Sequence, residues 1–421
     1  MAPHEPQGAG RGPRRHLRRH HRRHQGLAEL ISTENGSPVS WSVMGQVFAA
    51  TMVADQYVAL ADSYAFTDVR AGMMGPSEVR RVPVGVAAGI IPWNVPLFIS
   101  MLKLAPALVA GCTMVLKPAP ESPLDAYVLA QMLSDAGLPP GVVNIVAAGR
   151  EVGEHLVTHP GVDKVSFTGS TAVGRHIGAL CGGLLRPVTL ELGGKSAAIV
   201  LDDADIATAV AGIVPNGLMN NGQACVAQTR ILAGRERYAE VVEAVTEATG
   251  AMKVGDALDP GTEVGPLVAE RQRDRVEGLI ASGREQGARV TVGGGRPAGL
   301  DRGWFVEPTV FADVTNDMRI AQEEIFGPVL SVIPFDDVED AVRIANDSDY
   351  GLSGSVWGAD SEAAADVARR IRTGTINVNT FTMDMGSPFG GCKASGLGRE
   401  LGPEGLEAYL ETQTVAHRAE V

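Results

Sequence analysis

Residues 84–191 alternate between short apolar segments and segments of helical length, and this alternation restricts the fold more than any other feature. Five strands are predicted, at Val84–Ile91, Thr113–Lys117, Val142–Val146, Lys164–Phe167 and Val188–Glu191. Helix-length segments separate them, at 97–110, 122–136, 151–157 and 171–181. Strands joined by helical crossovers predict an α/β fold with a parallel, doubly wound sheet.

Turn-forming and polar residues follow four of these strands. They are Pro92–Pro96 after the first strand, Lys117–Glu121 at the second, Thr168–Thr171 after the fourth and Glu191–Lys195 at the fifth. In doubly wound sheets, ligands bind beyond the carboxyl ends of the strands. The sequence therefore predicts a ligand site at this edge of the sheet.

The remaining chain divides into recognisable parts. Residues 27–63 are expected to be helical with a break at Gly36–Pro38, and 64–83 suits a pair of exposed strands. A second alternating region covers about 195–395, and 409–415 is strand-like. Its clearest segments are Ala197–Leu201, 204–219, Thr229–Ala233, 237–251, Arg289–Val292, Val329–Ile333 and Thr375–Val378.

Charge is unevenly placed in this chain of 421 residues. The net charge is −13, yet residues 1–24 hold seven arginines and one glutamate, which leaves −19 on the rest. So acidic a body is a poor non-specific binder of nucleic acid. The Arg- and His-rich arm lacks an apolar face, and we expect it to be a disordered tail, although basic arms can also bind nucleic acid or anionic lipid.

Four cysteines in so long a chain form no disulfide framework and contain no CxxC pair, which favours a reducing, cytoplasmic compartment. No HExxH or clustered Cys/His spacing is present, so we expect no metal site. No apolar run reaches the length of a membrane span, so no membrane partner is expected.

Two strand ends suit the binding of phosphate and ribose. Gly169–Gly174 opens a helix directly after a strand, where free backbone N–H groups and the helix dipole bind phosphate. Lys117 stands at a strand end beside two prolines. Taken singly, Gly169–Gly174 is better explained as an ordinary helix N-cap, and a solvated strand-end lysine is the alternative for Lys117.

Three residues suit covalent catalysis. Cys225 follows Asn-Gly-Gln-Ala between a helix and a strand, Glu191 precedes two glycines, and Asn94 lies in a turn between Trp93 and Val95. A thiol, a carboxylate of raised pKa and a side-chain amide suit a nucleophile, a general base and an oxyanion donor. A buried structural thiol, a strand-end charge and ordinary turn chemistry are the alternatives for each residue alone.

In combination and in this order, the motifs resemble the aldehyde dehydrogenase superfamily from about Leu27 to Val415. The matching stretches are PWNVP (92–96), LKPAPESP (116–123), FTGST (167–171), ELGGKS (191–196), NNGQAC (220–225), EEIFGPV (323–329), NDSDYGL (346–352) and PFGGCKASGLGRELG (388–402).

The resemblance implies NAD as cofactor, Cys225 as nucleophile, Glu191 as general base and Asn94 as oxyanion donor. Water deprotonated by Glu191 then hydrolyses a thioester on Cys225. The residues that it implies for cofactor binding are Ile91, Pro92, Trp93, Lys117, Glu121, Gly149, Phe167, Gly169, Ser170, Leu192, Gly193, Glu324 and Phe326.

The resemblance also implies a domain plan. A doubly wound cofactor-binding domain takes 25–63 and 84–193, a second α/β catalytic domain takes 194–403, and small oligomerisation strands take 64–83 and 404–421. The last element implies a homodimer or homotetramer.

Two departures from the family pattern stand out. An acidic residue is usual three positions after the strand-end lysine, but Pro120 stands there and Glu121 follows, so NADP remains an alternative to NAD. Family members also carry several dozen more residues ahead of Leu27. A misassigned start or a partly lost domain would account for this difference.

The substrate is expected to be an uncharged aldehyde, because apolar Leu102, Met219 and Phe381–Met383 are placed along the tunnel by the resemblance. Three other functions stay open. The first is a semialdehyde-specific enzyme, which would need a cationic anchor at the tunnel mouth, but residues 379–388 contain no arginine. The second is a catalytically impaired, truncated homologue that acts as a binding protein. The third is a cysteine hydrolase.

Overall fold

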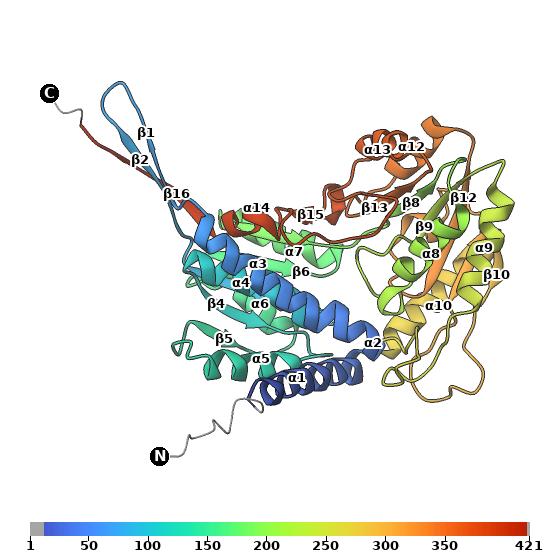
Figure 1. Cartoon of the computed structure of the whole chain (residues 1–421), viewed down its shortest axis with the longest axis horizontal. Helices are drawn as coiled ribbons and strands as arrows, with labels where there is room; N and C mark the ends of the chain where they lie inside the picture. Colours follow the sequence, from blue (N-terminus) through green and yellow to red (C-terminus); the bar gives the residue numbers. More distant parts are fainter. Residues whose placement is uncertain (1–11, 419–421) are drawn as a thin grey trace, which may run out of the picture.

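The computed structural model describes the backbone of residues 12–418 and the side chains of residues 24–418. Two α/β units stand side by side, each built on a mainly parallel sheet, and a small three-stranded sheet projects from the first unit (Figure 1). The predicted fold class is confirmed.

The first unit holds a six-stranded sheet in the order β15-β7-β6-β3-β4-β5. Its strands are β3 (Val86–Ile90), β4 (Thr113–Lys117), β5 (Val143–Ile145), β6 (Lys164–Thr168), β7 (Val188–Glu191) and β15 (Gly396–Leu397). The crossover helices are α4 (Pro96–Ala110), α5 (Leu124–Asp135), α6 (Arg150–Thr158) and α7 (Thr171–Gly183). All five predicted parallel strands and all four crossovers are present, and β15 adds an antiparallel edge.

The direction of winding reverses at β3, which pairs with β4 on one side and with β6 on the other. A crevice forms outside the carboxyl ends of the strands at such a switch point. Helices cover both faces of this sheet, so β3 is apolar on both sides, and Ala87 and Ala88 are fully buried.

Helix α1 covers Gly12–Asn35, so the disorder expected for 1–24 is wrong for residues 12–24, while 1–11 lie outside the described residues. Arginine and glutamine have good helix propensity. The helix is already nucleated by the buried apolar face around Ile31, and extending an existing helix costs less than starting one.

The helical region then breaks as predicted. Gly36 has a φ of +80°, and a Cβ there would lie 2.1 Å from the Pro266 carbonyl oxygen, so only glycine fits this close approach. After the break come α2 (Val39–Trp41), the π-helical turn η1 (Ser42–Phe48) and α3 (Ala49–Ser63).

The second unit holds a seven-stranded sheet in the order β10-β11-β12-β9-β8-β13-β14. The strands are β8 (Ala197–Val200), β9 (Arg230–Gly234), β10 (Arg289–Val292), β11 (Thr309–Ala312), β12 (Val329–Phe335), β13 (Gly354–Trp357) and β14 (Asn377–Val378). The helices are α8 (Ile206–Gly217), α9 (Tyr238–Gly250), α10 (Glu270–Glu285), α11 (Arg319–Gln322), α12 (Val338–Asn346) and α13 (Ser361–Arg369). The strands β11 and β13 were not among the segments predicted from the sequence.

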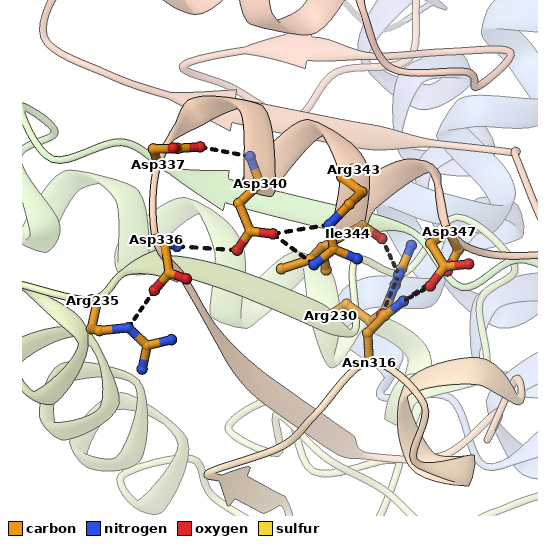
Figure 2. Close-up of polar contacts among 9 residues, drawn as sticks. All are labelled: Arg230, Arg235, Asn316, Asp336, Asp337, Asp340, Arg343, Ile344 and Asp347. Atoms are coloured by element: carbon orange, nitrogen blue, oxygen red, sulfur yellow. Dashed lines mark hydrogen bonds and ion pairs between the residues drawn. The ribbon is translucent and has the colours of Figure 1, made fainter.

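A buried arginine anchors the second sheet. The Arg230 guanidinium at the start of β9 donates to the Asn316 side chain at 2.9 Å and to the Ile344 carbonyl at 3.0 Å (Figure 2). It also donates to the Ala345 carbonyl at 3.0 Å. These carbonyls belong to the last turn of α12, which has no intrahelical partners for them. Arg230 also donates to the Lys195 carbonyl at 2.9 Å, which ties this sheet to the Gly-Gly-Lys turn after β7.

The projecting sheet joins β1 (Thr67–Arg70), β2 (Ser77–Pro83) and β16 (Leu410–Ala416), strands that the sequence predicted, and β16 runs antiparallel to β2 (Figure 1). Before β16 come η3 (Lys393–Ser395), β15 and α14 (Gly402–Glu407). Because β15 pairs with β7, the chain has returned to the first unit by Gly396. The predicted end of the catalytic domain at residue 403 is therefore wrong by several residues.

Candidate active site

Two cavities meet at Cys225, which lines both. The larger, of about 480 Å³, lies beyond the carboxyl ends of β3 and β6, where the sequence predicted a ligand site. Of the predicted site residues, it is lined by Pro92, Trp93, Asn94, Gly169, Ser170, Leu192, Gly193, Cys225, Glu324 and Phe326.

The smaller cavity, of about 250 Å³, has mostly apolar walls. Of the residues expected along the substrate tunnel, Leu102, Met219, Phe381 and Met383 line it and Thr382 does not. Glu191 lines it too, so the carboxylate and the thiol face the same small volume. A reactive group that borders both a polar-rimmed cleft and an apolar pocket suits a reaction between two ligands.

The loop before Cys225 is held in an unusual conformation. Asn220 and Asn221 have φ values of +52° and +62° in the 3-10 turn η2 (Met219–Gly222), a left-handed region that asparagine tolerates better than most residues. The Asn221 side-chain amide donates to the Gly36 carbonyl at 2.8 Å and to the Pro266 carbonyl at 2.9 Å. These bonds fix the position of the turn that carries Cys225.

Asn94 is joined directly to that loop. Its side-chain Nδ2 donates to the Gln223 backbone carbonyl at 2.9 Å. The backbone carbonyl of Asn94 accepts hydrogen bonds from the side chains of Asn35, Gln46 and Asn220. The side chain is buried and immobilised, and the second N–H of its amide has no partner among the described residues. It can therefore serve as an oxyanion donor without reorganising.

The thiol of Cys225 is strongly protonated in this environment. Burial raises its pKa to about 12, and the nearby Glu324 and Glu191 carboxylates add to the shift. Only the thiolate is an effective nucleophile. The site must therefore be activated by removal of the proton or by a positive charge that offsets the two carboxylates.

Glu191 ends β7, opposite Gly396 of β15. The side chain is buried, and neither carboxylate oxygen has a hydrogen-bond partner among the described residues. Burial raises its pKa well above the usual glutamate value, and Glu400 raises it further. A carboxyl group of raised pKa next to a nucleophile suits general-base catalysis near neutral pH.

A buried ion pair lies behind Glu191. Lys103 Nζ is 2.6 Å from Glu400 Oε1 and also donates to the Ser166 and Thr168 hydroxyls. Sequence reasoning did not single out either charged residue. Apolar residues surround Lys103 in α4, and this was the available signal, because a lone charge in an apolar helix needs a buried partner.

Glu324 is held against the Gly-Gly turn after β7. Its Oε1 accepts from the Gly194 N–H at 3.0 Å, and a Cβ on Gly193 would lie 2.3 Å from Oε2. Burial raises the pKa of Glu324 to about 7. Only glycine at position 193 leaves room for the Glu324 carboxylate. This carboxylate also borders the larger cavity, where it can accept hydrogen bonds from the hydroxyl groups of a ribose.

Aromatic residues form the wall of the larger cavity beside Cys225. The rings of Trp93 and Phe326 meet edge to face with centroids 5.4 Å apart. Phe326 has a φ of +60°, a strained value for an aromatic residue, and Gln272 Nε2 donates to its carbonyl at 2.7 Å. An aromatic wall of this kind suits a flat ring such as nicotinamide.

Helix α7 begins at the other end of this cavity. Ser170 is the N-cap, and its hydroxyl accepts from the Val173 N–H at 3.4 Å. Gly169 stands over Phe167, where a Cβ would lie 2.5 Å from the ring, and its N–H donates to the Glu191 carbonyl at 3.0 Å. Thr171 and Ala172 of the first turn line the cavity, and N–H groups at this position in a helix have no intrahelical partner. A helix of thirteen residues with an open first turn suits phosphate.

Five predicted cofactor residues, Ile91, Lys117, Glu121, Gly149 and Phe167, do not line this cavity. Phe167 and Ile91 are buried in the core. Lys117 Nζ donates to the Pro118 and Ala148 carbonyls, and burial lowers its pKa.

The other two residues of this group lie on the surface. Gly149 is the exposed N-cap of α6. Glu121 forms an ion pair with Arg271 of α10, on the second unit.

Three residues that sequence reasoning missed also line the larger cavity: Gln272, Arg275 and Tyr350. Arg275 donates to the Glu324 carbonyl at 2.7 Å. No strand precedes Gln272 or Arg275, and only the docking of α10 brings them to the cleft.

A sequence model of the aldehyde dehydrogenase family matches residues 14–415. This chain belongs to that family. Geranial dehydrogenase of Castellaniella defragrans is 52% identical to this aldehyde dehydrogenase over 405 residues, 96% of this chain and 84% of that protein. The family makes the chain an oxidoreductase that acts on aldehydes.

Solved structures agree with this assignment. An aldehyde dehydrogenase of Mycobacterium tuberculosis in complex with NAD+ matches with a TM-score of 0.92 at 51% identity, over 95% of this chain and 83% of that chain. A variant of aldehyde dehydrogenase C of Pseudomonas syringae, in complex with NAD+ and octanal, matches with a TM-score of 0.90 at 42% identity, over 95% and 82%.

Within 24–418, no three His, Cys, Asp or Glu side chains are grouped so that they could hold a metal ion. No helix in the described part of this aldehyde dehydrogenase is both long enough and apolar enough to cross a membrane.

Proposed function

We propose that this aldehyde dehydrogenase oxidises apolar aldehydes to carboxylic acids through a thioester on Cys225, with NAD as hydride acceptor. The observation that carries the proposal is the meeting of two cavities at Cys225, one with Asn94 and Glu324 in its walls and one lined by Glu191 and apolar side chains. Relatives crystallised with NAD+ support the choice of cofactor.

In the first step, the Cys225 thiol loses its proton to water, the thiolate Sγ bonds to the aldehyde carbon, and the carbonyl electron pair moves to oxygen. The free N–H of the Asn94 amide and the backbone N–H of Cys225 donate to that oxygen. Because Asn94 is already fixed by its bond to Gln223, stabilising the developing charge requires no rearrangement.

Bound NAD supplies the acceptor for the hydride that the substrate carbon then loses. The chain holds it with three features: the Trp93 and Phe326 wall, the Glu324 carboxylate and the open first turn of α7. When the hydride leaves, the electron pair on oxygen re-forms the carbonyl. The substrate is then held on Cys225 Sγ as a thioester.

Hydrolysis releases the acid. Glu191 takes a proton from water, the water oxygen bonds to the acyl carbon, and the bond between that carbon and Cys225 Sγ breaks. The sulfur leaves as thiolate, and the carboxylic acid departs from the smaller cavity. Neither Glu191 oxygen is committed to another hydrogen bond within the described residues, so both can accept from the water.

The apolar walls of the smaller cavity support an uncharged hydrophobic substrate. Geranial, named for a relative that is 52% identical, and octanal, bound in a relative that is 42% identical, are both apolar aldehydes. We propose this class of substrate for this chain.

The test is the ultraviolet absorbance of reduced nicotinamide when the protein meets octanal, geranial and NAD. Reduction is expected with wild-type protein and with Cys392→Ala, a matched loss of a partly exposed thiol outside both cavities, but not with Cys225→Ala. No reduction by folded wild-type protein would contradict the proposal and favour a binding protein. The same assay with NADP in place of NAD tests the alternative cofactor. The carboxylate of Glu121 is already paired with Arg271, so it repels the 2′-phosphate of NADP less than a free carboxylate would.

We further propose a cytoplasmic homodimer or homotetramer. The projecting sheet carries apolar side chains in the open, with Val69 68%, Met73 99% and Met74 85% exposed, and exposed apolar groups of this kind mark association surfaces. Light scattering after gel filtration tests the assembly, and a monomer would contradict it. Cell fractionation tests the location, which the four free thiols favour.

A further inference from the structure

One wall of the smaller cavity is the π-helical turn η1 with its flanking residues. Trp41, Gly45 and Ala49 from this segment line the cavity opposite Phe98 and Ile99 of α4. Short π-helical turns within α-helical segments are rare and occur often at functional sites. The π-helical turn in this cavity wall therefore indicates a functional role for the segment.

The indole of Trp41 occupies the space that a side chain at position 45 would fill. A Cβ built on Gly45 would lie 2.7 Å from Cζ2, 2.8 Å from Cε2 and 3.0 Å from Cη2 of that indole. No real Cβ approaches so closely, so even an alanine at this position would displace the ring. The missing side chain of Gly45 thus gives Trp41 its place at the cavity wall.

Exposure distinguishes the two ends of this cavity. Phe98, Leu102 and Val226 are buried, and the cavity reaches Cys225 and Glu191 among them. Trp41 and Gly45 are half-buried, as are Phe381 and Met383, and we take these residues to mark the mouth of the cavity. Cys225 is half-buried as well, but it also borders the larger cavity. A substrate whose aldehyde carbon is at Cys225 brings only its distal carbons near Trp41.

We propose that Trp41, positioned by the absence of a side chain at Gly45, determines specificity by contacting the distal carbons of long apolar aldehydes. This inference rests on the proposed function and adds the residue that selects by chain length. An indole offers a large apolar contact area, and because it has few rotatable bonds, ordering it costs little conformational entropy. An enzyme discriminates between substrates by the ratio of their kcat/KM values.

The first experiment compares kcat/KM for octanal with kcat/KM for propanal. We expect this ratio to fall about tenfold in Trp41→Ala, which corresponds to the loss of contact with about two methylene groups. Gly45→Ala should lower the ratio similarly, because it displaces the indole. Phe48→Ala is the matched control: Phe48 lies on the same turn, is 51% exposed and does not line the cavity, so its loss should leave the ratio unchanged.

The double variant Trp41→Ala/Gly45→Ala measures whether the effect of the Gly45 substitution on this ratio depends on the presence of Trp41. If Gly45 acts through Trp41, its substitution should lower the ratio no further once the indole is gone. An equal effect of Gly45→Ala in both backgrounds would overturn the inference, as would a ratio within about twofold of wild type in Trp41→Ala. Trp41→Phe keeps an aromatic ring and should give an intermediate ratio, which covers the case in which the alanine variant does not fold.

A binding measurement separates this inference from the proposed function. In the Cys225→Ala background, which cannot turn over, calorimetry with octanal gives Kd directly. Adding Trp41→Ala should raise that Kd about tenfold if Trp41 contacts the chain. An unchanged Kd overturns the inference, whereas absence of nicotinamide reduction in the wild type with octanal still bound overturns only the proposed function.

Discussion

Lys103 Nζ lies 2.6 Å from Glu400 Oε1 in the interior, where the two side chains are 0% and 5% exposed. The pair joins α4, early in the chain, to the segment just before α14. Glu400 raises the pKa of Glu191 and Lys103 lowers it, so the proposed general base shares its surroundings with this pair.

Breaking the pair from one side is expected to be costly. Lys103→Met leaves Glu400 buried without its cation, and loss of one partner of a buried pair typically lowers the free energy of unfolding by about 3–5 kcal/mol. Glu400→Gln should act similarly, and the double variant should lose less than the two single losses together. Urea unfolding followed by fluorescence measures this. Arg235→Gln, which breaks an exposed pair with Asp336, is the control and should change stability by less than about 1 kcal/mol.

Glu191→Gln is expected to separate the two halves of the reaction. The first turnover should still reduce nicotinamide, because nothing in that half needs a base at position 191. Later turnovers should be slower by about 100-fold or more, the range typical for loss of a general base. Mass spectrometry of the quenched protein should then show an acyl group on Cys225. A steady-state rate within a few-fold of wild type would contradict the assignment of Glu191.

The raised pKa of Glu191 predicts a particular pH dependence. A base works only when deprotonated, and Glu191 stays protonated over a range in which an ordinary glutamate is ionised. The steady-state rate should therefore increase with pH through a midpoint well above the usual glutamate value. The first-turnover burst of Glu191→Gln should show no midpoint in this range and should instead rise steadily with the thiolate fraction of Cys225. A rate that is flat across that range in the wild type would count against a raised pKa.

The high pKa of Cys225 predicts slow alkylation of the free protein. Below the pKa of about 12, the thiolate fraction and hence the rate with iodoacetamide should grow about tenfold per pH unit. NAD should accelerate the reaction at fixed pH, because its cationic ring offsets the charges of Glu324 and Glu191. Peptide mapping locates the label, and Cys392 serves as the internal reference. Equal rates with and without NAD would contradict this electrostatic account.

Glu324→Gln is expected to have two opposite effects. It removes the carboxylate that contributes most, after burial, to the raised pKa of Cys225, so alkylation without NAD should become faster. It also weakens hydrogen bonding to a ribose, and loss of a charged acceptor costs about 1.5–3 kcal/mol, so KM for NAD should rise about tenfold or more. Slower alkylation, or an unchanged KM, would show that the carboxylate does not act in this way.

Much of the site could be predicted because its residues follow strands. Asn94 and Ser170 stand four and two residues beyond strands of one parallel sheet, and Glu191 is the last residue of a third strand, so topology alone brings them together. Glu400 and Arg275 could not be found in this way. They come from a loop and a helix distant in sequence, and only tertiary packing brings them to Lys103 and Glu324.

Local propensity also failed at short or marginal elements. The two-residue strand β15 has no period to detect, so the return of the chain to the first unit was missed. The helical start at Gly12 was missed because the arm has no apolar face of its own, while its helix continues from a segment that is packed.

The pairing of β15 with β7 has a consequence for how a ribosome makes this enzyme. The edge of the first sheet, with Glu191 on it, is closed by residues that follow about two hundred positions later. At about 5–20 residues per second, the nascent chain waits roughly ten to forty seconds with that edge open. An unpaired strand edge invites association with other chains. A nascent or prematurely terminated chain therefore exposes a strand edge that the finished enzyme covers.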